Sequence, residues 1–219
     1  MTKLESLWVR ILQSDPVSIF GNDVGMLLDR NWGDRIPQPG YVGRLYSEGG
    51  IVFVSMNPGG MRGDGLGETD RIQLGALHEL RAARIHEVRD KFLATMRVLE
   101  TIMPTWTIFR NFVEPILNSA HIELPSVAYV NLLKWRTKKD ARMKRLYDAS
   151  WNAHTREQLL LLDPQLVISI GMSADNALRR LYTGKATVLA IPRVIGNNIG
   201  LRGREAIERI CQELRVRRD

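Results

Sequence analysis

The sequence contains very little cysteine: Cys211 is the only one among its 219 residues. A lone cysteine cannot form an internal disulfide, and it fits the reducing interior of a cell. Cys211 falls within an expected amphipathic helix, where a buried structural thiol explains it better than a nucleophile. Long apolar runs are also lacking, since segments such as 51–54 and 159–162 are far too short to span a bilayer.

Signals for export and for metal binding are lacking as well. The first residues, Met-Thr-Lys-Leu-Glu-Ser-Leu-Trp, contain no uninterrupted apolar segment, so no signal peptide is indicated and a soluble, cytoplasmic protein is expected. None of the four histidines stands near cysteine or carboxylates at the spacing of metal ligands. We therefore expect neither a metal nor a cofactor. These histidines are His78, His86, His121 and His154.

One glycine-rich segment is weakly similar to a phosphate-binding loop. Residues 63–67 read Gly-Asp-Gly-Leu-Gly, but they lack the lysine and the hydroxyl residue of a P-loop. Three acidic residues nearby, Asp64, Glu68 and Asp70, could supply an acid or a base, or could simply solvate the loop. Solvation is the preferred interpretation.

What the sequence does have is an ordinary globular composition and a positive charge. Its 44% hydrophobic and 25% charged residues allow a sizeable core, and no repeat or linker divides the chain. The net charge of +7 favours a polyanionic partner. Basic residues gather in segment 134–145 beside Trp135, and again near the C-terminus, where a solvated helix face and a basic tail are alternative explanations. The first cluster includes Lys134, Arg136, Lys138 and Lys139.

Hydrophobic periodicity predicts alternating strands and helices. Short β-rich runs at 51–55, 126–132, 166–170 and 187–190 predict four short apolar strands, the first of them buried. Helical patterns cover 3–13, 71–119 with a break near Pro104, 145–162, 173–181 with Ser173 as its N-cap, and 202–214. This alternation predicts an α/β protein with three layers, α/β/α, around a four-stranded parallel sheet. We expect one domain, residues 1–219, with residues 1–40 forming a helical and loop extension packed on it.

Amide side chains stand where three of the four expected strands end. The relevant segments are 57–60, 131–139 and 191–198. Because functional loops gather at the carboxyl ends of parallel strands, these segments predict a common site.

The first of these segments carries a family resemblance. Residues 52–60 read Val-Phe-Val-Ser-Met-Asn-Pro-Gly-Gly. They resemble the first active-site motif of the Asn-Pro-Gly branch of the uracil-DNA glycosylase superfamily. This branch holds the mismatch-specific and thymine DNA glycosylases and the single-strand-selective monofunctional uracil glycosylases. Ser55 stands in the place of the motif's first glycine. Taken alone, Asn-Pro-Gly is also an ordinary turn after a strand.

The resemblance implies a role for each residue of this motif. Asn57 would hold the water that attacks C1′ of the deoxyribose, while Met56, Pro58 and Gly59 would contact the base. A neutral amide suffices for this role because excision passes through an oxocarbenium-like sugar, so the water mainly needs positioning. The sharp turn would let backbone N–H groups face the departing base.

Two further segments resemble the superfamily in the same order along the chain, so that the resemblance covers roughly residues 40–214. Residues 127–135, Val-Ala-Tyr-Val-Asn-Leu-Leu-Lys-Trp, resemble its asparagine-bearing strand. By this resemblance Asn131 would read the Watson–Crick edge of a flipped base, because one amide offers a donor and an acceptor. An asparagine that satisfies backbone groups at a strand end is the alternative. Residues 161–178 resemble a structural segment in which Gly171 and Ala174 permit close helix–sheet packing.

Two departures from the superfamily pattern concern the pocket. The last motif, His-Pro-Ser or Met-Pro-Ser in the superfamily, corresponds here to Ile-Pro-Arg-Val-Ile-Gly-Asn-Asn at 191–198, where only Pro192 is kept. The residues that remain as DNA contacts are Arg193 for a phosphate, Val194 and Ile195 as an apolar wedge, and Asn197 and Asn198. The aromatic expected to stack on the base is missing from 68–71, and its candidate replacements are Phe109, Phe112 and Trp135.

These observations predict a monofunctional DNA glycosylase that needs no cofactor. The altered pocket favours a bulky modified base over plain uracil, in repair or in defence against phage DNA. A catalytically weak or inactive superfamily member that binds damaged or modified DNA is the first alternative, and a nucleotide or phosphate-sugar binding protein is the second. DNA is the expected partner, no membrane is expected, and the chain is expected to be a monomer.

Overall fold

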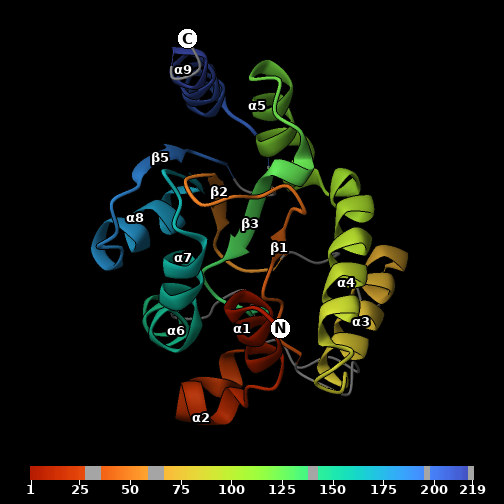
Figure 1. Cartoon of the computed structure of the whole chain (residues 1–219). Coiled ribbons are helices and arrows are strands. Elements are labelled where there is room, and N and C mark those ends of the chain that lie inside the picture. Colours follow the sequence, from red (N-terminus) through yellow and green to blue (C-terminus); the bar gives the residue numbers. More distant parts are fainter. Residues whose placement is uncertain (28–35, 59–66, 138–142, 195–197, 217–219) are drawn as a thin grey trace.

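The structure, a computed structural model, describes residues 1–27, 36–58, 67–137, 143–194 and 198–216. These residues form a five-stranded sheet with the strand order β1-β3-β2-β4-β5 and helices packed around it (Figure 1). The strands are β1 (Tyr41–Val42), β2 (Ile51–Ser55), β3 (Val127–Asn131), β4 (Leu166–Ile170) and β5 (Thr187–Ile191). The α/β class predicted from the sequence is therefore correct.

The four strands expected from the sequence are all present and parallel to one another. Every residue of β2, β3 and β4 is buried, which explains why these strands are continuous apolar runs rather than alternating ones. β2 and β3 are neighbours, and Ser55 is paired with Asn131 at their carboxyl ends. This register brings the two predicted asparagine segments side by side.

The number of strands differs from the prediction. β1 pairs antiparallel with β3, Tyr41 opposite Tyr129, so the sheet is mixed and has five strands rather than four. β1 lies between the predicted N-terminal extension, residues 1–40, and the first predicted strand, 51–55, where the sequence predicted no element. With two residues it is too short for any periodic pattern, and tertiary contacts define it. Gly40 precedes it at φ +113, where an added Cβ would lie 2.3 Å from the Tyr129 carbonyl oxygen.

Most helices follow the predicted segments with shifted ends, but the helix at 16–20 was not predicted, and the segment 71–119 is interrupted between Arg81 and Val88 as well as near Pro104. The helices are α1 (Lys3–Leu12), α2 (Pro16–Phe20), α3 (Glu68–Arg81), α4 (Val88–Ile102), α5 (Glu114–Ser119), α6 (Met143–Ser150), α7 (Arg156–Leu162), α8 (Met172–Leu181) and α9 (Leu201–Val216). Short 3-10 turns are η1 (Gly21–Met26), η2 (Met103–Thr105) and η4 (Leu124–Ser126), and π-helical turns are η3 (Phe109–Val113) and η5 (Trp151–Thr155).

Two helices differ from the sequence interpretation. α8 begins at Met172 with Gly171 as its N-cap, so Ser173 lies inside the first turn and is not the cap. Gly171 has φ +93, which glycine tolerates and serine does not, and its N–H donates to the Ile191 carbonyl at 2.8 Å. The long helix expected at 145–162 is continuous but contains the π-helical turn η5 between α6 and α7.

Helix α1 ties the N-terminal residues to the rest of the chain. Thr2 and Glu5 form a capping box at its start. Its apolar face buries Leu7 and Trp8, and Trp8 Nε1 donates to the Gly40 carbonyl at 3.3 Å. α1 contacts α3, α4 and α7, so it packs between the two flanks of helices seen in Figure 1.

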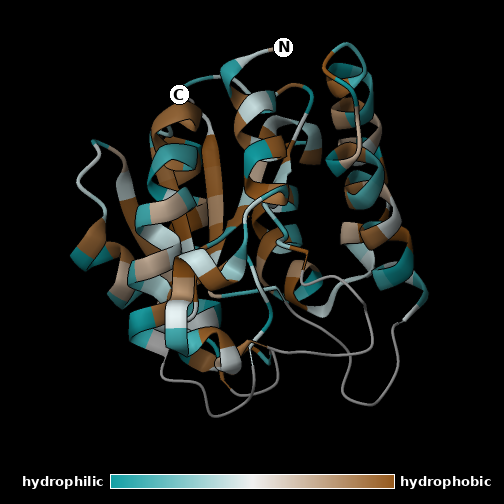
Figure 2. Ribbon diagram, turned by 90° about the horizontal axis from the view of Figure 1, so that it is seen from below, coloured by the Kyte–Doolittle hydropathy of each residue, from teal (hydrophilic) through white to brown (hydrophobic). Residues whose placement is uncertain are grey.

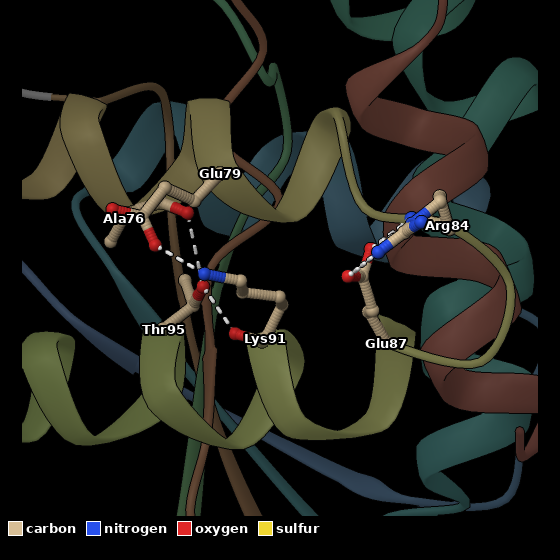
Figure 3. Close-up of polar contacts among 6 residues, drawn as sticks. All are labelled: Ala76, Glu79, Arg84, Glu87, Lys91 and Thr95. Atoms are coloured by element: carbon tan, nitrogen blue, oxygen red, sulfur yellow. Dashed lines mark hydrogen bonds and ion pairs between the residues drawn. The ribbon is translucent and has the colours of Figure 1, made fainter.

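Helices α3 and α4 lie side by side and are joined by polar contacts (Figure 3). Lys91 Nζ donates to Glu79 at 2.8 Å, and the buried Thr95 hydroxyl donates to the Ala76 carbonyl at 3.2 Å. In the connecting turn, Arg84 pairs with Glu87 and lowers the pKa of that carboxyl to about 2. Exposed pairs of this kind add little stability, so the apolar seam between the helices holds α3 in place.

The core lies between the strands and the inner faces of the helices. Figure 2 shows mainly hydrophobic strands, and helices whose hydrophilic positions face outward. The largest fully buried aromatic side chains of the core include Trp8, Phe53 and Phe112. Among the described residues, no helix combines the length and the apolar character needed to cross a bilayer.

Candidate functional site

A cavity of about 480 Å³ lies at the carboxyl ends of β2 and β3. Its wall includes Asn57 and Pro58 just after β2, and Asn131 at the end of β3. The first turn of α3 and the segment 105–108 after η2 supply further wall residues. The structure thus joins the two asparagines that the sequence singled out in one cavity.

Asn57 is oriented by a residue that the sequence analysis did not single out. Its Nδ2 donates to Thr137 Oγ1 at 3.0 Å. Thr137 follows β3 and forms an isolated bridge with Leu27, which fixes its backbone. No hydrogen bond from the described residues reaches Asn57 Oδ1, so the acceptor of this amide is available to a molecule in the cavity.

Asn131 is oriented by Ser55 on the neighbouring strand. Ser55 Oγ donates to Asn131 Oδ1 at 2.5 Å, and both side chains are buried. The Asn131 carbonyl oxygen accepts a hydrogen bond from Lys134 Nζ. Beyond the strands, Leu132 N–H donates to the Ser55 carbonyl at 2.9 Å. Asn131 is therefore held through its backbone and its side chain.

Tyr129 extends this set of contacts into the sheet. It lies two residues before Asn131, hence on the same face of β3, and its hydroxyl shares a hydrogen bond with Ser55. Burial raises the pKa of Tyr129 to about 12, which Ser55 and Arg193 only partly offset. The phenol therefore keeps its proton at neutral pH.

Aromatic walls come from residues other than the expected ones. Trp106 lines the cavity together with Tyr129, and their ring centroids are 6.5 Å apart in an edge-on arrangement. Trp106 is partly exposed, so its ring surface is accessible to a ligand. The predicted replacements do not serve: Phe109, Phe112 and Trp135 are buried in the core and do not line the cavity. Trp135 packs edge-on against Phe20 instead.

Two glutamines add buried amides to the wall. Gln73 Nε2 donates to Gln38 Oε1 at 3.2 Å, and both side chains are buried. Gln38 also donates its backbone N–H to the Lys134 carbonyl at 2.7 Å. The cavity thus combines four amide side chains with an indole ring, a mixture that suits a planar polar ligand.

Two arginines line the cavity. Arg136 is only 9% exposed and pairs with Asp70 at 2.5 Å, so this cation is largely neutralised within the wall. The interpretation of Asp70 as a solvating residue is wrong, because its carboxylate is 13% exposed and lies in this pair. Arg193 crosses Gly171 so closely that a Cβ there would lie 3.1 Å from Nε. It brings a positive charge near Tyr129.

Lys134 is a correction to the predicted DNA-binding cluster. Its side chain has no exposed surface, so it cannot contact a phosphate from outside. Burial lowers the pKa of Lys134 well below its usual value. It instead supports Asn131 from behind, as described above.

Other predicted contacts lie apart from the cavity. Met56 is partly buried against the core and does not line it. Val194, 51% exposed, forms an isolated antiparallel bridge with Asn198, in which the Val194 N–H donates to the Asn198 carbonyl at 3.1 Å. The residues Gly59, Lys138, Lys139, Ile195 and Asn197, as well as Asp64, fall outside the described part of the chain.

A second group of buried polar side chains lies on one face of the helix that runs through α6, η5 and α7. Among the described residues, neither ring nitrogen of His154 has a hydrogen-bond partner, and the same holds for the hydroxyls of Tyr147 and Ser150. Burial, and then the neighbouring Lys134, lower the pKa of His154 to about 4. His154 is therefore neutral at physiological pH.

No family model matches the chain, and no curated protein matches it. Within the part of the chain that the structure describes, no three histidine, cysteine or acidic side chains come together as metal ligands.

Proposed function

We propose that this protein is a monofunctional DNA glycosylase of the uracil-DNA glycosylase superfamily, with the three-layer arrangement of that fold. It flips a modified base out of DNA and hydrolyses the N-glycosidic bond. The observation that carries the proposal is that one cavity holds both strand-end asparagines, Asn57, whose oxygen accepts no hydrogen bond from the described residues, and Asn131 beside an aromatic wall.

Each of these cavity residues has a separate role in base excision. The flipped base lies against Trp106 and is read by Asn131. The C1′–N1 bond breaks with its electron pair leaving on the base, and the sugar becomes oxocarbenium-like. Asn57 Oδ1 accepts a hydrogen bond from a water, whose oxygen adds to C1′ while its proton passes to solvent. Thr137 keeps the Asn57 amide in the orientation that this step needs.

The proposed substrate is an enlarged base. A cavity of about 480 Å³ falls within the range that holds drug-sized ligands, and it exceeds what one pyrimidine ring fills. Thr105, Thr107 and Arg193 offer hydrogen bonds in its wall to a polar substituent such as a sugar. Val194, exposed beside Arg193, supplies an apolar wedge into the duplex. Repair and defence against phage DNA both require such an activity.

A panel of DNAs with different modified bases tests the proposal, with released bases identified by mass spectrometry. We expect release of a substituted pyrimidine by the wild type. Asn57→Ala should slow release by at least a hundredfold and change DNA affinity only a few fold, because positioning the water stabilises the transition state more than the ground state. The control is Asn152→Ala, an exposed asparagine on η5. Tight binding of modified DNA without any release would favour the inactive DNA-binding alternative, and saturable binding of free nucleotides would favour the other.

A further inference from the structure

The two cavity asparagines are held with opposite ends of their amides tied. Asn57 uses its Nδ2 donor on Thr137, which leaves its oxygen for the cavity. Asn131 uses its oxygen on Ser55, and among the described residues no hydrogen bond occupies its Nδ2. The two amides therefore differ in the end that is held: Asn57 keeps both lone pairs of its oxygen for a ligand, and Asn131 keeps both of its N–H groups.

The contacts behind Asn131 fix this direction. Tyr129 keeps its proton and shares a hydrogen bond with Ser55. When the phenol donates to Ser55 Oγ, the serine proton is directed to Asn131 Oδ1. A reversed Asn131 amide would place its N–H₂ group against Ser55 and force both hydroxyls to reorient. Ser55 and Tyr129 thus hold the Asn131 amide in one orientation.

The orientation of Asn131 bears on which base edge fits the cavity. In a cytosine ring, O2 and the unprotonated N3 are adjacent acceptors, and both can accept from an Asn131 N–H. In a uracil ring, N3 carries a proton. An Asn131 donor that faces N3–H leaves two donors unpaired in a buried site, which is costly.

We propose that Ser55 and Tyr129 are specificity-determining residues that make the cavity select a cytosine-type base edge over a uracil-type edge. This inference rests on the proposed function and names its substrate class. The bond to Ser55 turns Asn131 Oδ1 towards β2 and takes one of its two lone pairs, whereas both N–H groups stay available for base reading. The unprotonated N3 therefore decides the fit. The uracil anion is by itself a better leaving group than the cytosine anion. A faster release of cytosine would therefore have to come from the cavity.

Matched pairs of substrates isolate this effect. Each pair holds a 5-substituted cytosine and the uracil with the same substituent: hydrogen, hydroxymethyl or glycosylated hydroxymethyl. Each base is placed opposite a stable abasic analogue, so that neither is paired. Single-turnover release is measured for the wild type, Ser55→Ala, Tyr129→Phe and Ser169→Ala. Ser169 is a matched control, because it is a buried strand serine whose hydroxyl contacts Asp175 outside the cavity.

We expect the wild type to release the cytosine member roughly tenfold or more faster than its uracil partner, the factor that one unpaired buried donor produces. In Ser55→Ala, Asn131 turns freely and pairs its oxygen with N3–H. The ratio should then fall towards one, mainly because uracil release rises. Tyr129→Phe should lower the ratio less, and Ser169→Ala should leave it unchanged.

Four outcomes would overturn the inference. Equal release of both members by the wild type, or an unchanged ratio in Ser55→Ala, would refute the role of Ser55 and Tyr129 in orienting Asn131. Either result would leave the glycosylase proposal intact. If Ser55→Ala does not fold, an unchanged ratio in Tyr129→Phe has the same meaning. Release from no pair at all would refute the proposed function and this inference together.

Discussion

Thr137 is the residue whose contribution to the site is easiest to isolate. Its hydroxyl accepts the hydrogen bond that turns the Asn57 oxygen towards the cavity. Thr137→Val keeps the shape of the side chain but removes the acceptor, so we predict about fivefold slower base release, the effect of one hydrogen bond. Thr137→Ser keeps the hydroxyl and should stay within about twofold of the wild type. Single-turnover kinetics measure both, and equal rates for the two variants would show that the hydroxyl has no role.

Lys134 carries a second prediction at this scale. Because its side chain is fully buried and donates to the Asn131 carbonyl, Lys134→Met should leave the salt dependence of DNA binding unchanged. It should lower the free energy of unfolding by about 1 kcal/mol, since the carbonyl loses its partner. Binding titrations at several salt concentrations and urea unfolding provide the measurements. A salt slope reduced by about one would mean that Lys134 reaches a phosphate.

The sequence identifies only some of the site residues, for physical reasons. Asn57 and Asn131 were predictable because each follows an apolar strand, and neighbouring parallel strands end at the same edge. Trp106, Gln38 and Gln73 were not, because they reach the cavity from a loop or from a helix whose position depends on tertiary packing. A basic residue beside an aromatic also looked like a surface cluster, whereas Lys134 and Trp135 are buried.

At the scale of elements, the π-helical turn η5 makes stability depend on pH. It places His154 in the core without hydrogen-bond partners for its ring. The folded-state pKa of about 4 lies below the usual 6.5, so the unfolded chain takes up a proton as the pH falls and the folded chain resists it. The contribution is fully present above pH 6.5 and is lost as the pH approaches 4.

We therefore predict that the wild type loses about 2 kcal/mol of unfolding free energy between pH 7 and pH 5 from this residue alone. Urea unfolding at both pH values provides the measurement. His154→Gln cannot take up the proton, so its unfolding free energy should fall by about 2 kcal/mol less than that of the wild type between these pH values. The carboxylates contribute equally to the wild type and to the variant. The same pH dependence in both would show that His154 is not held neutral.

The sheet shows which elements could be predicted from the sequence and which could not. The apolar runs of β2, β3 and β4 identified the parallel core, because buried strands between helical patterns leave few other arrangements. β1 was missed because two residues carry no periodicity. The start of α8 was placed one residue late because a glycine with positive φ, rather than the following serine, caps it.

At the scale of the whole molecule, the positive charge is spread over two ends of the sheet. Arg193 lines the cavity after β5. Arg215, in the last turn of α9, donates to Ser119 Oγ at 2.7 Å, and Ser119 ends α5, just before the chain enters β3 at its amino end. The basic C-terminal helix therefore ends on the side away from the cavity.

This separation predicts unequal effects of two similar substitutions. Arg193→Gln should reduce the salt slope of DNA binding by about one, the value for one lost phosphate contact. Arg215→Gln removes the same charge from the molecule but should leave the slope unchanged. Fluorescence anisotropy across a salt series measures both. Equal slopes in the two variants would mean that net charge alone governs binding.

The residues of the cavity wall come from positions between Gln38 and Arg193 of the chain. Ligand binding in the cavity is therefore coupled to folding of this whole span. No contiguous fragment that lacks either end of this span can form the complete wall, so a ligand recognises only the fully folded chain. Its binding free energy then adds in full to the stability of the native state, by RT ln(1 + [L]/Kd). The melting temperature itself thus becomes an assay for ligands: at a fixed concentration, a non-hydrolysable analogue of the right base raises it with the logarithm of its affinity, without any turnover.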